Sequence, residues 1–361
     1  MDVPAAARRV GPGVSGVVPR GAAVSTREAV RVAVIGTGSI AQVAHLPILA
    51  RMRGVDLVGL YDSDRARART LAGRLGVERV YASADEIWTD AAVDAVIIST
   101  PSHLHEREVC DGLEAGKYVF CEKPLALTSE GARRILHTSG AESRLMVGMN
   151  QRFRPDAAAL RSFTAGRELG DIFYVRAGWL NRAINRGPRT WRQRKTGAGG
   201  GALMDLGIQM LDLSLWLLGY PAAERVAAHL HRPRGSEVED SAVLLLFLGG
   251  DRVVNLEVTW NLVSDRERQY VHLLGAAGSG SLGPLKVYKE METGLLDVTP
   301  ALAPGRENQF TASYRQELAF FAEAVRGEQQ LTAPAEQVAL LEIVEAAYRS
   351  AEEGAEVGVG G

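Results

Sequence analysis

The stretch DLGIQMLD, at positions 205 to 212, places three polar side chains at helical spacing. Asp205, Gln209 and Asp212 are related as i, i+4 and i+7, so on an α-helix they share one face. Two carboxylates flank a glutamine, whose amide can orient a hydroxyl or a carbonyl but cannot take a proton. A glycine run at 199–201 precedes the stretch and permits close approach. The pattern predicts a site helix with no titratable group at its centre.

A second group of residues has the spacing of a phosphate-binding turn. VAVIGTGSIA contains Gly36, Gly38 and Ala41 in a G-x-G-x-x-A pattern that follows an apolar run and opens a predicted helix. Gly36 permits a tight turn, Gly38 lets the backbone approach a pyrophosphate, and Ala41 keeps helix and strand close. A helix N-terminus favours phosphate charge, so the turn, including Ser39 and Ile40, is predicted to bind a dinucleotide. A similar domain without a dinucleotide is the alternative.

An acidic residue at the end of the next apolar run indicates which dinucleotide binds. Asp62 lies 24 positions after Gly38, close to the spacing of about 20 that is typical of NAD-binding folds. A carboxylate there accepts hydrogen bonds from the adenosine ribose and repels a 2′-phosphate, which favours NAD over NADP. Arg65 and Arg67 weaken this preference because an arginine can hold the phosphate, so NADP stays possible.

The order of predicted strands and helices that must position these residues differs between the two halves of the chain. Between residues 27 and 150, apolar strands alternate with helical stretches, which indicates a Rossmann domain with a parallel, doubly wound sheet. Its strands are expected at 30–36, 55–62, 93–100, 118–124 and 144–150. Helices are expected at 64–75 and 105–115.

From residue 151 to 361 strand-like runs follow one another directly, which predicts a C-terminal α/β domain with a largely antiparallel, open sheet. Its strands are expected at 172–180, 225–231, 241–248, 252–260 and 269–276. Helices are expected at 202–218, 311–326 and 335–352, and the last two can pack back on the first domain. The boundary between the two domains is placed near Asn150.

Composition excludes several classes of protein. The 361 residues suffice for two domains with cores of their own, and 46% hydrophobic with 23% charged residues is ordinary soluble composition. A net charge of −2 argues against nucleic-acid binding, and no run approaches 18 apolar residues, so no membrane span is expected. Cys110 and Cys121 give neither a disulfide framework nor zinc spacing, so no metal site is predicted and a cytoplasmic location fits. Residues 1–26 are predicted to be a disordered leader, with an export signal at Arg8-Arg9 as the alternative.

The stretch AGKYVFCEKPLALT adds a lysine that could do chemistry. An ammonium beside a hydroxyl or carbonyl oxygen can donate a hydrogen bond to it and stabilise a developing alkoxide. Burial and a neighbouring nicotinamide cation would favour the neutral amine, so Lys123 could also exchange a proton. Glu122 is expected to position or tune Lys123. The alternative is that the two residues form a surface pair.

These motifs together resemble the glucose–fructose oxidoreductase, inositol dehydrogenase and MocA (Gfo/Idh/MocA) family. The resemblance covers roughly residues 30 to 355 and rests on GTGSIA, STPSHLH, AGKYVFCEKPLA, MNQRFRP, GGGALMDLGIQMLD and SAEEG. It implies a Rossmann domain that binds NAD(H) or NADP(H), with Lys123 beside the nicotinamide and the substrate and a possible cis bond to Pro124. The residues implied to line the cofactor are Ser99, Thr100, Pro101, His105 and Glu122.

The resemblance also has implications for partners. Substrates of the family are often sugars, cyclitols or their derivatives. The open sheet of the second domain is implied to lie over the substrate site, and it often forms the interface of a homo-oligomer, so a dimer or a tetramer is expected.

The family's usual pattern in the site helix is Asp-x-Gly-x-His-x-x-Asp, and its histidine typically moves the proton. Here Asp205, Gly207 and Asp212 match, while Gln209 stands in place of the histidine. General acid–base help is worth about 10²–10⁴ in rate, so another group must supply it. Lys123 is expected to carry the proton, with Asp205 as an alternative relay through water. Gln209 is expected to hold the substrate, and Asp212 to support packing.

The segment before the glycine run is basic and contains no acid. Its cations are Arg176, Arg182, Arg186, Arg189, Arg192, Arg194 and Lys195. Arginines here could hold a carboxylate or phosphate on the substrate, whereas a solvated loop is the alternative. The resemblance adds Asn150, Arg152 and Trp191 as substrate contacts, and Trp260 is assigned to core packing.

The function predicted from these residues is NAD(P)-dependent transfer of a hydride to or from a hydroxyl or carbonyl carbon. The substrate would be a sugar, a cyclitol or a sugar acid, with the nicotinamide carrying the redox chemistry. Two other functions fit the same residues. One is a cofactor-binding or regulatory protein without redox activity, and the other is a hydrolase or lyase that retains NAD and acts by transient oxidation.

Overall fold

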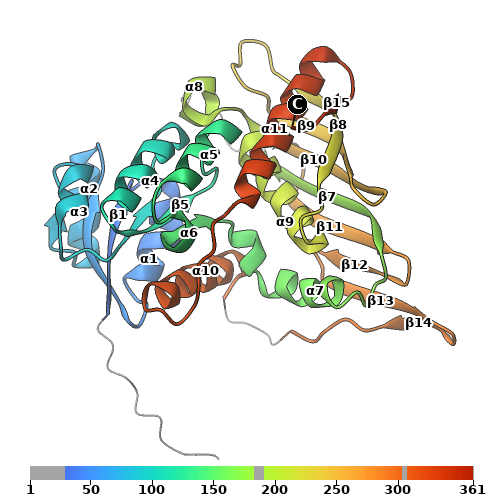
Figure 1. The fold of residues 1–361 in the computed structure, drawn as a ribbon, viewed down its shortest axis with the longest axis horizontal. Coiled ribbons are helices and arrows are strands. Elements are labelled where there is room, and N and C mark those ends of the chain that lie inside the picture. Colours follow the sequence, from blue (N-terminus) through green and yellow to red (C-terminus); the bar gives the residue numbers. More distant parts are fainter. Residues whose placement is uncertain (1–28, 183–190, 303–306, 361) are drawn as a thin grey trace, which may run out of the picture.

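The computed structural model describes residues 29–182, 191–302 and 307–360. Within these residues the chain forms two layered units, each built on its own β-sheet (Figure 1). The predicted leader, residues 1–26, lies outside the described residues, as does the segment 183–190 with Arg186 and Arg189.

The first sheet has six parallel strands in the order β3-β2-β1-β4-β5-β6. Its strands are β1 (Val30–Ile35), β2 (Val55–Tyr61), β3 (Arg79–Val80), β4 (Ala95–Ile98), β5 (Tyr118–Glu122) and β6 (Leu145–Gly148). The predicted apolar runs form strands here because both faces of the sheet are covered, and Val34, Ile35, Ile97 and Ile98 are fully buried. The strand order reverses between β1 and β4, where ligands bind beyond the carboxyl ends of the strands.

Helices cover both faces of the first sheet. A π-helical turn (Ala41–His45) leads into α1 (Leu46–Leu49), and the helices that follow are α2 (Arg65–Leu75), α3 (Ala84–Thr89), α4 (His105–Glu114), α5 (Ser129–His137) and α6 (Ala141–Arg144). α1 and α2 pack on one face, and α3, α4 and α5 pack on the other. Asp64, Ser83 and Thr128 accept backbone hydrogen bonds at the N-caps of α2, α3 and α5, which fixes where these helices begin.

The second sheet has nine strands in the order β14-β13-β12-β11-β7-β10-β9-β8-β15, in which β7 and β10 pair in parallel and the other neighbours pair antiparallel. Its strands are β7 (Ile172–Arg182), β8 (Ala223–His231), β9 (Ser241–Leu248), β10 (Arg252–Leu262), β11 (Arg268–Gly275), β12 (Gly278–Leu282), β13 (Lys286–Met291), β14 (Gly294–Asp297) and β15 (Val357–Gly358). Burial alternates along β9, with Leu244 and Leu246 inside and Val243 and Leu245 outside, as expected when one face is covered.

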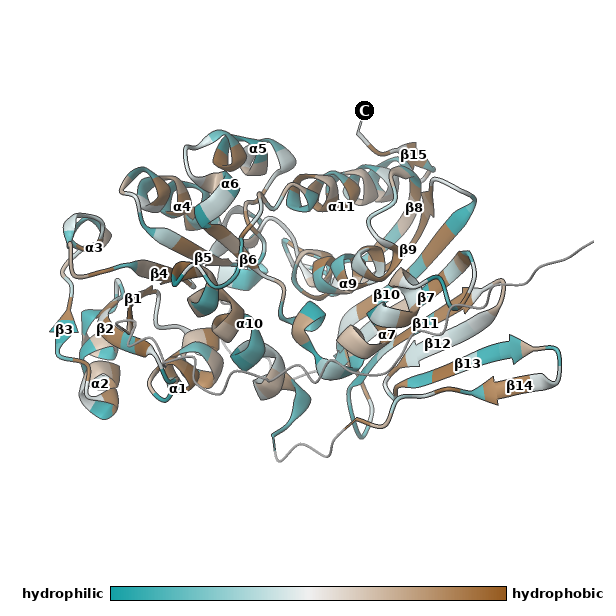
Figure 2. Ribbon diagram, turned by 60° about the horizontal axis from the view of Figure 1, so that its bottom comes forward, coloured by the Kyte–Doolittle hydropathy of each residue, from teal (hydrophilic) through white to brown (hydrophobic). Residues whose placement is uncertain are grey.

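The helices of the second half divide between the two sheets. They are α7 (Pro155–Ala165), α8 (Lys195–Ala198), α9 (Ile208–Leu218), α10 (Gln309–Val325) and α11 (Glu336–Glu353). α7, α9 and α11 lie over one face of the second sheet (Figure 2). α10 packs instead on the first sheet beside α1, where Leu318 and Phe321 join its apolar core.

The helix predicted at 202–218 begins as a π-helical turn, Leu203–Gly207, and continues as α9. Turns of this kind widen a helix and are frequent at functional sites. The stretch Lys195–Leu218 is long and apolar enough to cross a membrane, but 83% of its most apolar window is buried inside the protein. Such burial is typical of the core helix of a folded domain.

The predicted fold class is confirmed, with a doubly wound Rossmann sheet followed by an α/β domain with a largely antiparallel open sheet. The apolar pattern does not predict β3, α3, α5, α7 or the strands β12 to β14. These elements are short or carry few apolar residues, and β14 is exposed along its whole length. The strands among them are determined by their pairing partners rather than by their own periodicity.

Candidate active site

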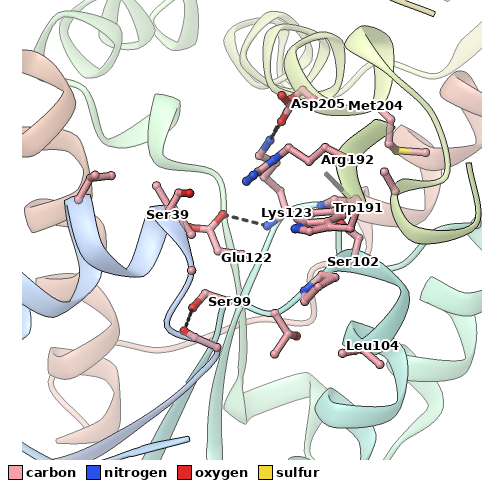
Figure 3. Close-up of a pocket in the computed structure, with 18 of the residues that line it drawn as sticks. Ser39, Ser99, Ser102, Leu104, Glu122, Lys123, Trp191, Arg192, Met204 and Asp205 are labelled. Atoms are coloured by element: carbon pink, nitrogen blue, oxygen red, sulfur yellow. Dashed lines mark hydrogen bonds and ion pairs between the residues drawn. The ribbon is translucent and has the colours of Figure 1, made fainter. Parts of the chain in front are cut away.

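A cavity of about 1070 Å³ opens between the carboxyl ends of the first sheet and the inner face of the second. The glycine turn lines it from the first domain, and Lys123, Asp205 and Gln209 line it from β5 and the site helix. The fold therefore brings the predicted dinucleotide turn and the predicted catalytic residues into one cavity (Figure 3).

The glycine turn has the shape that a dinucleotide needs. Gly36 has a φ of +85°, and a Cβ there would lie 2.7 Å from the carbonyl carbon of Ser99, so only glycine fits. Ser99 Oγ donates to the carbonyl of Gly36 at 2.7 Å and ties the turn to β4. Gly38 has no atom within 4 Å of its Cβ position, and with Ser39 and Ile40 it lines the cavity. The backbone is thus open to a pyrophosphate.

Asp62 lies just beyond β2, beside the glycine turn. Its Oδ2 accepts hydrogen bonds from the backbone nitrogen (2.6 Å) and the hydroxyl (2.8 Å) of Thr37, and its Oδ1 accepts from Arg67 Nη2 at 2.6 Å. Burial tends to raise the pKa of Asp62, but the Thr37 amide and the Arg67 guanidinium hold it below its ordinary value. Asp62 and Arg67 both line the cavity, so a cation offsets the charge of the predicted ribose-binding acid.

The segment after β4 contributes Thr100 and Pro101 to the cavity. His105, predicted to line the cofactor, does not: it is 1% exposed, and its ring nitrogens lie 2.7 Å from the Pro124 carbonyl and 3.0 Å from the Thr100 carbonyl. His105 is the first residue of α4, and its buried ring bridges the Thr100 and Pro124 carbonyls and so links the two loops that carry them. Thr100 Oγ1 also donates to Glu108, which lines the cavity and whose pKa burial raises to about 7.

Lys123 follows β5 and precedes a cis peptide bond to Pro124. Its Nζ donates to Asp205 Oδ1 at 2.6 Å and to the Asp205 carbonyl at 2.9 Å (Figure 3). Burial tends to raise the pKa of Asp205, but Lys123, with Arg192 and Trp260, holds it below its ordinary value. The side chains of Lys123 and Asp205 are 14% and 29% exposed, so the pair remains accessible from the cavity.

Glu122 also lines the cavity, but its main partner is His45, which the sequence did not single out. Glu122 Oε1 lies 2.8 Å from Nε2 of the fully buried His45, and Oε2 accepts from the Lys123 backbone nitrogen at 3.3 Å. Glu122 therefore contacts the backbone nitrogen of Lys123 and not its ammonium group. The ammonium group pairs with Asp205 instead.

Gln209 lines the cavity, and its Nε2 donates to the Asp205 carbonyl at 2.9 Å. Asp212, fully buried, accepts from Arg152 Nε at 2.8 Å and Nη2 at 2.5 Å. Arg152 also pairs with Glu336 at 3.0 Å and is not among the residues that line the cavity, so the structure does not bring it together with the other predicted substrate contacts. The buried carboxylate of Asp212 and the partly exposed one of Glu336 hold the guanidinium there, because a buried charge needs a partner.

The glycine run before the site helix serves a close approach between chain segments. Glu239, 1% exposed, accepts hydrogen bonds from Gly201 N (2.9 Å), Leu203 N (3.0 Å) and Tyr348 Oη (2.9 Å) through its Oε1. A Cβ at Gly200 would lie 1.8 Å from Tyr348 Oη, and one at Gly201 would lie 1.8 Å from the Glu239 carbonyl oxygen. The carboxylate satisfies the free N–H groups at the start of the helix that carries Asp205.

Three indole rings line the cavity from the second half of the chain, those of Trp179, Trp191 and Trp260. Trp260, predicted to pack in the core, contributes a hydrogen bond that lowers the pKa of Asp205. The end of β10 lies over the cavity, so Trp260 packs against the apolar core, as predicted, and also reaches the site.

Arg192 is the member of the described part of the basic segment that lines the cavity. Its guanidinium lies 4.8 Å from the centre of the Trp191 ring. Arg176, by contrast, pairs with Glu257 at 3.0 Å on the sheet. Basic residues that are neighbours in the sequence therefore lie in different places in the fold, with Arg192 in the cavity and Arg176 on the sheet.

Asn150 lines the cavity and donates to Ser313 Oγ on α10 at 2.9 Å. Asn181 on β7, and Phe310 and Tyr314 on α10, also line it, although the sequence analysis does not predict them. No local pattern marks these residues, because only the packing of α10 and β7 brings them to the cavity. Among the described residues, no group of three or more His, Cys, Asp or Glu could hold a metal ion.

Family models match the chain over most of its length. The model described as an oxidoreductase family with an NAD-binding Rossmann fold matches residues 30–149, and the model of that family's C-terminal alpha/beta domain matches residues 164–359. The chain belongs to the Gfo/Idh/MocA family. The predicted resemblance is confirmed, and so is NAD as the cofactor of the first domain.

Relatives of this Gfo/Idh/MocA protein include sugar and cyclitol dehydrogenases. D-glucoside 3-dehydrogenase of Escherichia coli K12 is 28% identical over 350 residues, which are 92% of this chain and 98% of the relative. Inositol 2-dehydrogenase of Acidothermus cellulolyticus is 30% identical, over 66% of this chain and 69% of the relative. GenD2 from gentamicin A biosynthesis, solved in complex with NAD, has a TM-score of 0.79 and 30% identity, and the match covers 96% of this chain and all of GenD2.

Proposed function

We propose that this Gfo/Idh/MocA protein oxidises a ring hydroxyl of a sugar or a cyclitol with NAD, and reduces the corresponding ketone in reverse. The observation that carries the proposal is the Lys123–Asp205 ion pair in the cavity that holds the dinucleotide turn. The names of two relatives, D-glucoside 3-dehydrogenase and inositol 2-dehydrogenase, support a ring hydroxyl as the reacting group. When bound, NAD accepts the hydride from the substrate carbon.

Lys123 is the main proton and oxyanion group of this proposal. Two N–H groups of its ammonium are bonded to Asp205, so one remains for the substrate oxygen. In oxidation, Lys123 first passes a proton to the Asp205 carboxylate, which releases it to water, and the resulting neutral amine then takes the hydroxyl proton as the hydride leaves. Reduction runs these steps in the opposite direction. A carboxylate behind the lysine thus does what a histidine at position 209 would do.

The walls of the cavity favour a ring-shaped substrate with a negative group. The indoles of Trp179, Trp191 and Trp260 offer flat apolar faces against which a sugar ring can pack. Arg192 forms no ion pair with any residue that the structure describes, whereas Lys123 pairs with Asp205. Its planar guanidinium suits a carboxylate or a phosphate, so a sugar acid is proposed to react better than its neutral analogue.

A substrate screen tests the reaction. The purified protein is incubated with NAD and D-glucose, methyl glucoside, myo-inositol or glucuronate, and NADH is followed by absorbance. Net NADH formation is the expected result. Retained NAD with product but no net NADH would instead identify a hydrolase or lyase. Tight cofactor binding without any turnover would identify a cofactor-binding protein, and equal rates with glucose and glucuronate would contradict the anionic substrate.

A lysine substitution tests the proton assignment. Lys123→Met is expected to lower kcat by at least about 10², since both the proton group and the oxyanion partner are lost. Gln209→Ala is expected mainly to raise KM. Lys289→Met, which removes a surface ion pair to Glu168, is the matched control and keeps wild-type rates. Near-normal kcat in Lys123→Met would show that the assignment is wrong.

The outer face of the second sheet supports a homo-oligomer. Helices cover only the opposite face of this sheet (Figure 2), and Val243, Leu245 and Leu274 are 39% to 50% exposed on the outer one. The Arg176–Glu257 pair places both signs of charge on the same face. We propose that the same face of a second copy covers it, because a self-complementary surface suits a two-fold interface.

A further inference from the structure

α10 brings one side chain into the cavity that the mechanism above does not use. The helix packs on the first sheet, yet Tyr314 lines the cavity shared by the dinucleotide turn and Lys123. Tyr314 is only 6% exposed. Its ring is held edge-on to His45, with 5.5 Å between ring centres, and against Phe310, with 4.9 Å between centres. The phenol is therefore fixed in position before a ligand binds.

The hydroxyl of Tyr314 is free to bind a ligand. No residue in the described part of the chain hydrogen-bonds it, and it is open to the cavity. The ring is nine-tenths buried while the hydroxyl faces the cavity, so a ligand in the cavity can be its hydrogen-bond partner. Burial, with the Glu122 and Asp205 carboxylates nearby, raises the pKa of Tyr314 well above its ordinary value. The phenol consequently stays protonated and can donate a hydrogen bond.

The side chains closest in sequence and structure to the Lys123–Asp205 pair already use part of their hydrogen-bonding capacity within the protein. Lys123 donates two N–H groups to Asp205, and Gln209 donates one of its two amide N–H groups to the Asp205 carbonyl. Asn150 has committed Nδ2 to Ser313. An alkoxide or a polarised carbonyl is generally stabilised by more than one aimed donor. Gln209, at the position of the family's histidine, donates one of its two amide hydrogens to the helix backbone, so a second aimed donor would complement it.

We infer that the Tyr314 hydroxyl is the second donor to the reacting oxygen of the substrate, and so a further catalytic residue of this site. The inference rests on the function proposed above. In oxidation Tyr314 holds the developing alkoxide together with Lys123, and in reduction the two polarise the ketone. No proton leaves Tyr314 in this role, so the transfer from substrate to Lys123 and Asp205 is unchanged.

Tyr314→Phe tests the inference, because it removes the hydroxyl and keeps the ring against His45 and Phe310. The variant is assayed with whichever of the four screen compounds the wild type oxidises fastest. We expect kcat to fall by about 10²-fold, in line with the loss of one oxyanion donor. The Kd for NADH, measured by fluorescence, and the melting temperature should stay within error of wild type. Tyr288→Phe on β13, far from the cavity, is the matched control and should leave kcat unchanged.

Two results would overturn the inference while leaving the proposed function standing. A kcat within threefold of wild type would show that the hydroxyl does not touch the reacting oxygen. A weaker NADH Kd with unchanged kcat would show that it binds the cofactor instead. If the wild type oxidises none of the four compounds, the proposed function fails and this inference falls with it.

Discussion

An alanine at Gly201 is expected to shift the site helix and slow catalysis without weakening cofactor binding. The Cβ would lie 1.8 Å from the Glu239 carbonyl oxygen, whereas real Cβ contacts essentially never fall under 3.0 Å. The two segments must therefore separate by about 1.2 Å. Glu239 also holds the Gly201 and Leu203 backbone nitrogens, so the start of the helix moves with Gly201. Asp205 and Gln209 follow on that helix.

The size of the effect follows from that displacement. A misplacement of about 1 Å can cost about 10² in rate, so kcat of Gly201→Ala should fall by about 100-fold. Overpacking of this kind costs about 1–3 kcal/mol of stability, which lowers the melting temperature by several degrees. The assay compares kcat, the NADH Kd by fluorescence, and thermal unfolding. The NADH Kd should stay within about twofold of wild type, because the dinucleotide turn lies on the other domain.

Gly73→Ala is the matched control for this substitution. Gly73 is exposed on α2 with no atom within 4 Å of its Cβ position, so alanine there should stabilise the helix by about 0.5–1 kcal/mol and leave kcat unchanged. A Gly201→Ala protein with kcat within threefold of wild type and an unchanged melting temperature would refute the reasoning. Glu239 would then not position the site helix.

Three further predictions concern the cofactor, pH and assembly. Asp62→Asn should shift the ratio of kcat/KM for NAD over NADP towards NADP by about tenfold or more, because Arg67 loses the closer of its two carboxylate partners and can hold a 2′-phosphate; an unchanged ratio would contradict this. The pKa of Glu108 is raised from 4.5 to about 7, so the folded state keeps a proton that the unfolded state loses. Glu108 therefore contributes about 3 kcal/mol to the free energy of unfolding. This contribution is fully present below about pH 4.5 and is lost as pH rises through 7. Glu108→Gln should therefore show a smaller decline of melting temperature between pH 5 and about pH 8 than wild type, and parallel curves would count against the prediction. Leu245→Asp on the outer sheet face should convert the oligomer to a smaller species in light scattering at unchanged kcat per chain, and an unchanged mass would exclude that face as the interface.

The local parts of the site follow from the sequence. The glycine turn and Asp62 are encoded by spacing within a single βαβ unit, and the apolar runs of the first sheet predict its strands except the two-residue β3. The same reasoning predicts the site helix, because Asp205, Gln209 and Asp212 repeat with helical period. Short-range periodicity suffices wherever a residue's role depends on its own element.

Contacts between distant segments were decided by the tertiary structure alone. Lys123 forms its ion pair with Asp205, which is 82 positions away in the sequence, whereas the adjacent Glu122 contacts His45. The positive charge of Lys123 is therefore balanced by Asp205 at the centre of the site. Arg152 matches a family motif, yet the buried Asp212 draws it away from the cavity.

The remaining site residues carry no local signal. Glu239 reaches the glycine run from a loop, and Tyr314 enters from a helix that packs on the other domain. Sequence spacing reports which side chains share an element, but a buried charge or hydroxyl takes its partner from whatever the packed fold places beside it. The local amino-acid sequence therefore determines the glycine turn and the site helix. The packing of the two sheets and α10 determines which side chains meet in the cavity.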